Sequence, residues 1–225
     1  MLKAVRHEPA LPQYKRSLTD SQESSLDGVE MAKSLLEQDL YDSQYLGLQS
    51  LENMTNSARS SITATLTASR AVLCVSTNER DEGIQQAVCK ILTNGGPPKK
   101  RMRLCEGETS IRKSHVSVLH NKALSLLFNA LSALGKQVET EELHQIYENL
   151  NERNIVERLW EILGYSEQSP HEALLAAKCL LVLLTVYSTA QSHVDKRDLL
   201  HDAYSVGLSS HSALLRECKG LLEIL

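Results

Sequence analysis

The sequence predicts an all-α protein. Apolar residues make up 42% of the chain but aromatic residues only 4%, so a core would consist mainly of Leu, Ala, Val and Ile. Such side chains let helices approach one another closely. The 10 glycines and 5 prolines fall mostly in clusters, which leaves room for long helices between them. The 225 residues are enough to bury a core, in one long domain or in two small ones.

Charge and cysteine content exclude several classes of protein. Acids and bases are mixed along the chain and give a net charge of −4, so we expect no direct binding to nucleic acid and no membrane attachment. The N-terminal residues carry charge and proline where a secretory signal would be apolar. The most membrane-like stretch, Leu174–Tyr187, contains Lys178 and is shorter than the ~20 residues a bilayer requires. Five widely spaced cysteines are untypical of a disulfide framework, so we expect an intracellular protein with reduced thiols.

The N-terminal half divides into a tail and a helical segment. Residues 1–27 are polar and lack helical periodicity, so we expect a loosely ordered tail. A helical segment is expected over residues 28–93. Its expected apolar stripes are Met31, Leu35 and Leu36; Tyr41, Tyr45, Leu48 and Leu51; Ile62, Leu66, Ala68 and Leu73; and Ile84, Val88 and Ile91. Alternating Thr63, Thr65 and Thr67 would also fit a strand, but the Ala and Arg around them favour a helix.

A flexible basic loop is expected over residues 94–113. Two glycines and two prolines stop the preceding helix, and four cations follow within five residues. An extended basic peptide can set alternate side chains into acidic pockets of a receptor. The stretch resembles a monopartite nuclear localisation signal, formed by Pro98, Lys99, Lys100, Arg101, Met102 and Arg103. This resemblance implies a nuclear import receptor as partner and a location in nucleus and cytoplasm; a solvated basic loop and a weak phosphate contact stay open as alternatives.

A second helical segment is expected over residues 114–225. Its expected helices are Ser114–Leu134, a helix from Thr140, Ile155–Leu163, Ser169–Ala190, Leu199–Leu208 and Ala213–Leu225. Gly135 is expected as a C-cap, Pro170 near N1, and Lys178 at the edge of the longest apolar helix. The last helix ends without a polar cap, so its apolar face is a candidate oligomer contact.

Three expected helices share a small inward residue with an aliphatic residue four positions later. The pairs are Gly47 and Leu51, Ala123 and Leu127, and Ala176 and Leu180. Together with flanking polar turns, this pattern resembles the central helix of an armadillo repeat, over about residues 30–225. The resemblance implies an armadillo-like (armadillo or HEAT-type) α-solenoid of stacked helical hairpins, with a concave surface that binds peptides or helices of partner proteins. The copies are 76 and 53 residues apart rather than ~40–47, which implies an insertion or an irregular array.

No motif in the sequence indicates catalysis. Zinc-type spacings and a Gly-rich phosphate loop are missing, so we expect no metal, no cofactor and no catalytic residue. Cys74, Cys89, Cys179 and Cys218 lie among apolar residues, where a thiol stays protonated, and His115 and His120 are expected in solvated or capping roles. The leading hypothesis is a non-enzymatic interaction scaffold or regulator that acts in, or shuttles to, the nucleus. A structural or dimerising subunit of a larger assembly is the alternative, and an enzyme with an unrecognised site is a third.

Overall fold

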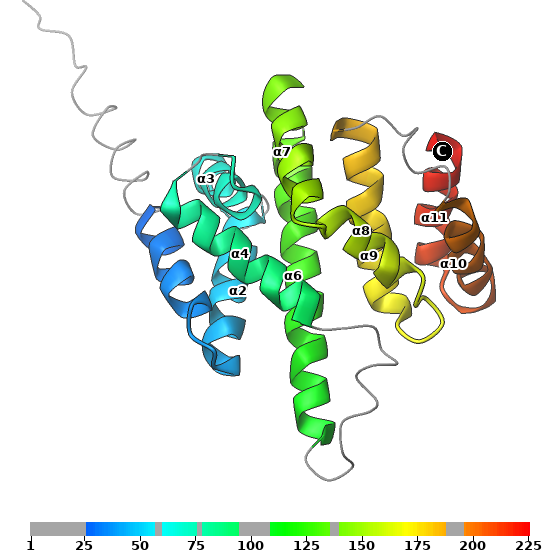
Figure 1. The fold of residues 1–225 in the computed structure, drawn as a ribbon, viewed down its shortest axis with the longest axis horizontal. Helices are drawn as coiled ribbons and strands as arrows, with labels where there is room; N and C mark the ends of the chain where they lie inside the picture. The colour runs from blue at the N-terminus through cyan, green and yellow to red at the C-terminus, as the bar shows by residue number, and fades with distance from the viewer. Residues whose placement is uncertain (1–25, 57–59, 76–77, 95–108, 136–139, 188–195) are drawn as a thin grey trace, which may run out of the picture.

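The computed structural model describes residues 26–56, 60–75, 78–94, 109–135, 140–187 and 196–225 (Figure 1). These residues are almost entirely helical and contain no strand, which confirms the all-α prediction. A helix over residues 26–36 is followed by α2 (Tyr41–Thr55), α3 (Ile62–Leu73), α4 (Glu79–Asn94), α6 (Thr109–Leu134), α7 (Thr140–Glu152), α8 (Ile155–Leu163), α9 (Pro170–Val182), the π-helical η1 (Leu183–Tyr187), α10 (Arg197–Ser210) and α11 (Ser212–Ile224). No helix in these ranges combines the length and the apolar character needed to cross a bilayer.

Some predicted features lie outside the described residues. These are most of the N-terminal tail and the whole candidate localisation signal, Pro98, Lys99, Lys100, Arg101, Met102 and Arg103. Helix α6 begins at Thr109, inside the range 94–113 that the sequence indicated as a loop.

The helices pack in two rows that follow the chain from one end of the molecule to the other (Figure 1). In the first row α2 contacts α6, α6 contacts α9, and α9 contacts α11. In the second row α3 contacts α4 and α7, α8 contacts α4 and α7, and α8 also contacts α10. Contacts of α3 and α4 with α6, of α8 with α9, and of α10 with α11 join the rows. The long helix α6 therefore lies between α2 and α9 and touches elements from both halves of the chain.

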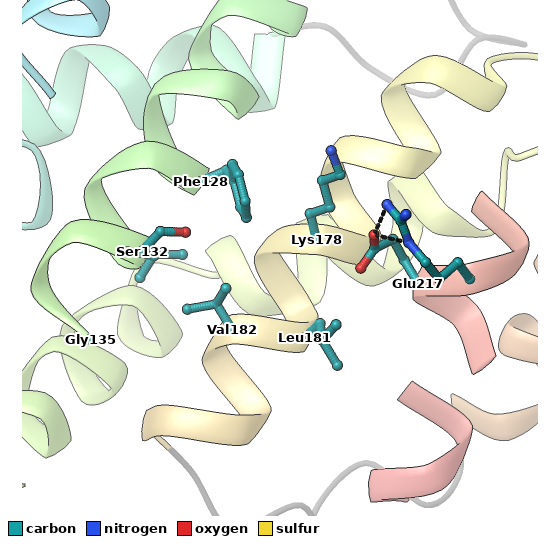
Figure 2. Close-up of a pocket in the computed structure, with 9 residues that line it drawn as sticks. Phe128, Ser132, Gly135, Lys178, Leu181, Val182 and Glu217 are labelled. Carbon is teal, nitrogen blue, oxygen red and sulfur yellow. Dashed lines mark hydrogen bonds and ion pairs between the residues drawn. The ribbon is translucent and has the colours of Figure 1, made fainter. Parts of the chain in front are cut away.

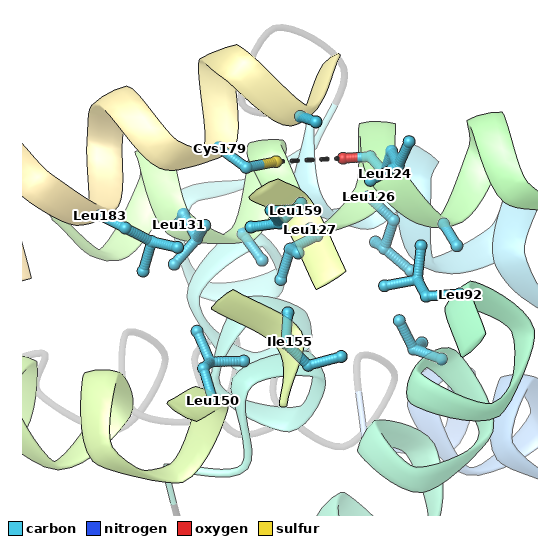
Figure 3. Packing of buried hydrophobic residues seen from close by; sticks show 14 of the residues in the cluster. Leu92, Leu124, Leu126, Leu127, Leu131, Leu150, Ile155, Leu159, Cys179 and Leu183 are labelled. Atoms are coloured by element: carbon cyan, nitrogen blue, oxygen red, sulfur yellow. Dashed lines mark hydrogen bonds between the residues drawn. The ribbon is translucent and has the colours of Figure 1, made fainter. Parts of the chain in front are cut away.

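One hydrophobic core fills the space between the rows, from Val29 near the start to Leu221 in α11. Figure 3 shows leucines of α6 packed with Leu92 of α4, Leu150 of α7 and Ile155 of α8. Trp160, the only tryptophan of the chain, is completely buried in this core. The two helical segments thus bury their apolar surface against each other, which is the main force that holds them together.

The three repeated pairs all face this core. All six residues are buried, and the five with side chains are at most 2% exposed. They are Gly47, Leu51, Ala123, Leu127, Ala176 and Leu180. The inward placement predicted from sequence is therefore confirmed. At Gly47 a Cβ atom would lie 2.9 Å from Cγ of Leu36 and 3.0 Å from the carbonyl oxygen of Ala32. The helix over residues 26–36 packs this closely on α2 because glycine has no side chain.

Some predicted inner residues face the solvent instead. Met31 is 66% exposed and Ile62 is 69% exposed, whereas Val29, Ala32 and Leu36 form the buried stripe of the first helix. The prediction was wrong at Met31 and Ile62, whereas Leu36, Ala68 and Leu73 of the same stripes are buried as predicted. Close approach to α2 at Gly47 favours a face with the small Ala32 at its centre.

Helix ends also differ from the prediction. Helix α2 begins after Leu40, whose side chain makes no capping hydrogen bond. The predicted helix over Ser169–Ala190 changes at Leu183 into the π-helical turn η1, in which the Thr185 hydroxyl donates to the Leu181 carbonyl. At the end of α11 the Arg197 guanidinium donates to the Leu225 carbonyl, so α10 supplies a polar contact that the sequence of α11 lacks.

Candidate functional site

A groove lies where α6, α9 and α11 of the first row come together (Figure 2). Its volume is about 450 Å³. It is lined by Phe128, Leu131, Ser132, Gly135, Lys178, Leu181, Val182, Arg216 and Glu217. On α6 the lining residues recur every three or four positions, so one face of that helix forms one wall. Helices α9 and α11 form the other walls, and the groove is about large enough for a few amino-acid side chains.

A cation and an aromatic ring meet in this groove. Lys178 of α9 places its Nζ 5.5 Å from the ring centre of Phe128 on α6, a cation–π contact. Both side chains are half-buried, and Leu181 and Val182 extend the apolar surface beside them. No carboxylate among the described residues pairs with Lys178. The sequence placed Lys178 at the edge of an interior helix; it borders a groove that three helices share.

Two other cations on the helices of the first row are paired. Arg216 of α11 is bound to the neighbouring Glu217, with Nη2 and Oε1 3.0 Å apart. Between α2 and α6 the carboxylate of Glu52 accepts from Lys122 at 2.7 Å and from Ser125 at 2.8 Å. Among the described residues that line the groove, Lys178 is therefore the cation without a paired carboxylate.

Aromatic side chains line the junction of α2 with α6. The rings of Tyr41 and His115 stack with their centres 3.8 Å apart, and Lys122 lies 5.1 Å from the ring centre of Tyr45. His115 is half-buried in this stack, so its expected solvated or capping role was wrong. These contacts join α2 and α6.

A second polar cluster is buried between the rows. The Ser117 hydroxyl donates to Oε1 of Glu172 at 3.0 Å, and Oε2 of Glu172 lies 3.2 Å from Nδ1 of His120. Nε2 of His120 lies 3.2 Å from the carbonyl oxygen of Leu92, which also accepts from Nε of Arg158 at 3.1 Å. Leu92 is in the last turn of α4, where carbonyl groups have no partner within the helix. The cluster thus satisfies a buried helix end and connects α4, α6, α8 and α9.

This cluster contains a serine, a histidine and an acid. The arrangement of its hydrogen bonds is nevertheless unsuited to nucleophilic catalysis. A catalytic serine needs its hydroxyl on the histidine that takes the proton. Here Ser117 bonds to Glu172, and the histidine nitrogen that would serve as base faces the Leu92 carbonyl. His120 is completely buried, which contradicts the solvated role expected from sequence, whereas its contact with the Leu92 carbonyl at the end of α4 agrees with the capping role.

The four described cysteines are poor nucleophiles. Burial raises the pKa of Cys89 to about 11 and that of Cys218 to about 12, from an ordinary value near 9. Burial also raises the pKa of Cys74 and of Cys179, whose thiol contacts the Leu124 carbonyl (Figure 3). Thiols with such pKa values remain protonated at neutral pH, and the thiolate is the reactive form.

The described ranges contain no group of three or more His, Cys, Asp or Glu residues that could hold a metal ion. Comparison of the chain with known protein families, with curated proteins and with solved structures finds no match. The case for a function therefore depends on the groove, the buried cluster and the arrangement of the helices.

Proposed function

We propose that this chain is a non-enzymatic interaction scaffold or regulator. It binds a peptide or a helical segment of a partner protein on the first row of helices, the exposed side of an armadillo-like α-solenoid. The observation that carries the proposal is the groove between α6, α9 and α11, which no single helix could form. Half-buried Phe128, Leu181 and Val182 offer apolar contact there, and Lys178 offers polar specificity.

The order of helix contacts supports the solenoid part of this proposal. The three helices with the repeated small-to-aliphatic pairs are α2, α6 and α9, and each contacts the next. In a solenoid each unit contacts only its neighbours, and equivalent helices form one continuous surface. Helix α11 extends the row and buries Leu214, Cys218 and Leu221 against it. Its pattern has no small residue at the first position, so sequence comparison within the chain overlooked it.

Blocking the groove tests the binding function. We expect purified protein to enrich specific peptides from a random library of short peptides, and the variant Ser132→Tyr to lose their binding at least tenfold because the ring fills the groove. Ser34→Tyr is the matched control, since Ser34 is exposed on the helix over residues 26–36. Fluorescence anisotropy of labelled peptides gives the affinities. Equal binding by wild type and Ser132→Tyr would contradict the proposal.

We further propose that the protein reaches the nucleus through an import receptor. Support comes from the sequence alone, in Pro98, Lys99, Lys100, Arg101, Met102 and Arg103. A fluorescent fusion lacking residues 98–103 should lose its nuclear enrichment, and a fusion with Lys99, Lys100 and Arg101 changed to Ala should lose it too. Changing Lys33, Lys90 and Lys219 to Ala is the control for loss of charge alone. Unchanged nuclear enrichment of the deletion would remove this proposal.

The alternative, a structural or dimerising subunit that uses α11, has less support. The large hydrophobic side chains that stand exposed in the described residues are Leu26, Met31, Leu40, Leu46, Ile62, Val116, Val118 and Leu208. None of them lies on α11, where the partly buried Leu222, Ile224 and Leu225 pack against the core. A large contact between copies through this helix would need more exposed apolar surface than it presents.

A further inference from the structure

The partner segment can be described more closely from the charges and shape of the groove. Resting on the proposed binding function, we propose that the groove between α6, α9 and α11 takes a protein segment in which an acidic side chain stands next to a large apolar one. The carboxylate pairs with Lys178. The apolar side chain enters between Phe128, Leu181 and Val182.

The acidic part follows from the state of Lys178. The Lys178 Nζ lies 5.5 Å from the ring centre of Phe128, and this cation–π contact favours a position of the ammonium group beside the groove (Figure 2). The side chain is half-buried and no described carboxylate neutralises it. A cation that is already partly desolvated and held in place gains more from an incoming carboxylate than a fully exposed lysine does.

The remaining charges of the groove agree with an acidic ligand. Arg216 and Glu217 form a pair of their own, so they add no net charge, and Lys178 leaves the groove with one positive charge. A basic segment would meet Lys178 and Arg216 without a free acid to pair with. The groove is therefore unsuited to the basic stretch 99–103 or to similar signals of other proteins.

The apolar part follows from the other lining residues. Phe128, Leu131, Leu181 and Val182 come from two adjacent helices and border one space. Leu131 is completely buried at its base, whereas the other three side chains are half-buried and retain surface that a ligand can cover. A volume of about 450 Å³ accepts a leucine, methionine or phenylalanine side chain together with part of its neighbours. Apolar contact would supply affinity, and the lysine would select the neighbouring residue.

The test is a peptide selection with three forms of the full chain. Wild type should enrich peptides with Asp or Glu beside Leu, Ile, Met or Phe. Lys178→Met keeps the apolar stem and should retain the apolar preference but lose the acidic one. Lys178→Glu should favour Lys or Arg at the same place. Lys90→Glu changes the net charge equally on the distant α4, where Lys90 pairs with Asp39, and should select as wild type does. Thermal unfolding by circular dichroism checks that each variant is folded.

A selected peptide then gives the coupling directly. Replacing its acidic residue by the matching amide should weaken binding to wild type about tenfold and binding to Lys178→Met by less than about twofold. Enriched peptides without an acidic preference, or an acidic preference that persists in Lys178→Met, would overturn this inference and leave the proposed function standing. A library from which nothing is enriched would instead contradict the proposed function, and this inference with it.

Discussion

Replacing Glu172 by alanine is expected to lower the free energy of unfolding by about 1–3 kcal/mol. Glu172 is only 4% exposed and its carboxylate faces Ser117 and the completely buried His120. Nδ1 of His120 lies 3.2 Å from Oε2 of Glu172, and Nε2 lies 3.2 Å from the Leu92 carbonyl oxygen. Without the carboxylate, the Ser117 hydroxyl would lose its acceptor and Nδ1 of the buried His120 would lose the polar group that faces it. Urea unfolding followed by the fluorescence of Trp160, the only tryptophan, measures the effect.

The chain contains a matched control for this experiment. His144 and Glu148 form a pair with the same groups at almost the same distance, 3.1 Å against 3.2 Å, but their side chains are 70% and 60% exposed. Glu148→Ala should therefore change the stability by less than about 1 kcal/mol. If Glu172→Ala prevents folding, the milder Glu172→Gln should still show a clear loss. Equal effects at Glu172 and Glu148 would show that burial of the pair is unimportant.

The helices were predictable from sequence because they depend on local patterns. The stop after Leu92, the cap at Gly135 and the Pro170 start are encoded within a few residues, and each appears within a few residues of its expected place. The repeated pairs were equally visible, because a small residue followed by an aliphatic one at helical spacing must face a neighbour. Which side of the first helix faces inward depended on its distance from Gly47, and this is a property of the packed pair.

The groove and the buried cluster could not be predicted in this way. Phe128 and Lys178 are far apart in the sequence, and only the contact of α6 with α9 brings them together. Leu92, His120 and Glu172 likewise belong to three helices, and each has an ordinary local setting. An acid in the first turn of α9 has a sufficient local explanation in the helix dipole, which hid its role as partner of a buried histidine. Long-range assembly of this kind leaves no signal in a single sequence.

Replacing Gly207 by alanine is expected to lower the free energy of unfolding by about 2–3 kcal/mol, although alanine is the better helix former. A Cβ atom at this position would lie 2.6 Å from the backbone nitrogen of Leu215 and 2.7 Å from its Cα. Backbone atoms cannot rotate away as a side chain can, so α10 and α11 would have to move apart. Both measures, urea unfolding and amide hydrogen exchange in α10 and α11, should show the loss.

Gly220→Ala in the same hairpin should have the opposite effect. A Cβ atom there would meet only the side chain of Leu181, at 3.4 and 3.5 Å, which is ordinary contact. The gain in helix propensity should then raise stability by about 0.5–1 kcal/mol. The same substitution is thus expected to lower stability at Gly207 and to raise it at Gly220. This difference distinguishes the effect of the close approach of α10 to α11 from the general cost of a glycine in a helix. If both variants are stabilised, α10 and α11 are not in contact at Gly207.

Because α11 forms one wall of the groove, Gly207→Ala should also weaken peptide binding there, while Ser34→Tyr leaves it unchanged.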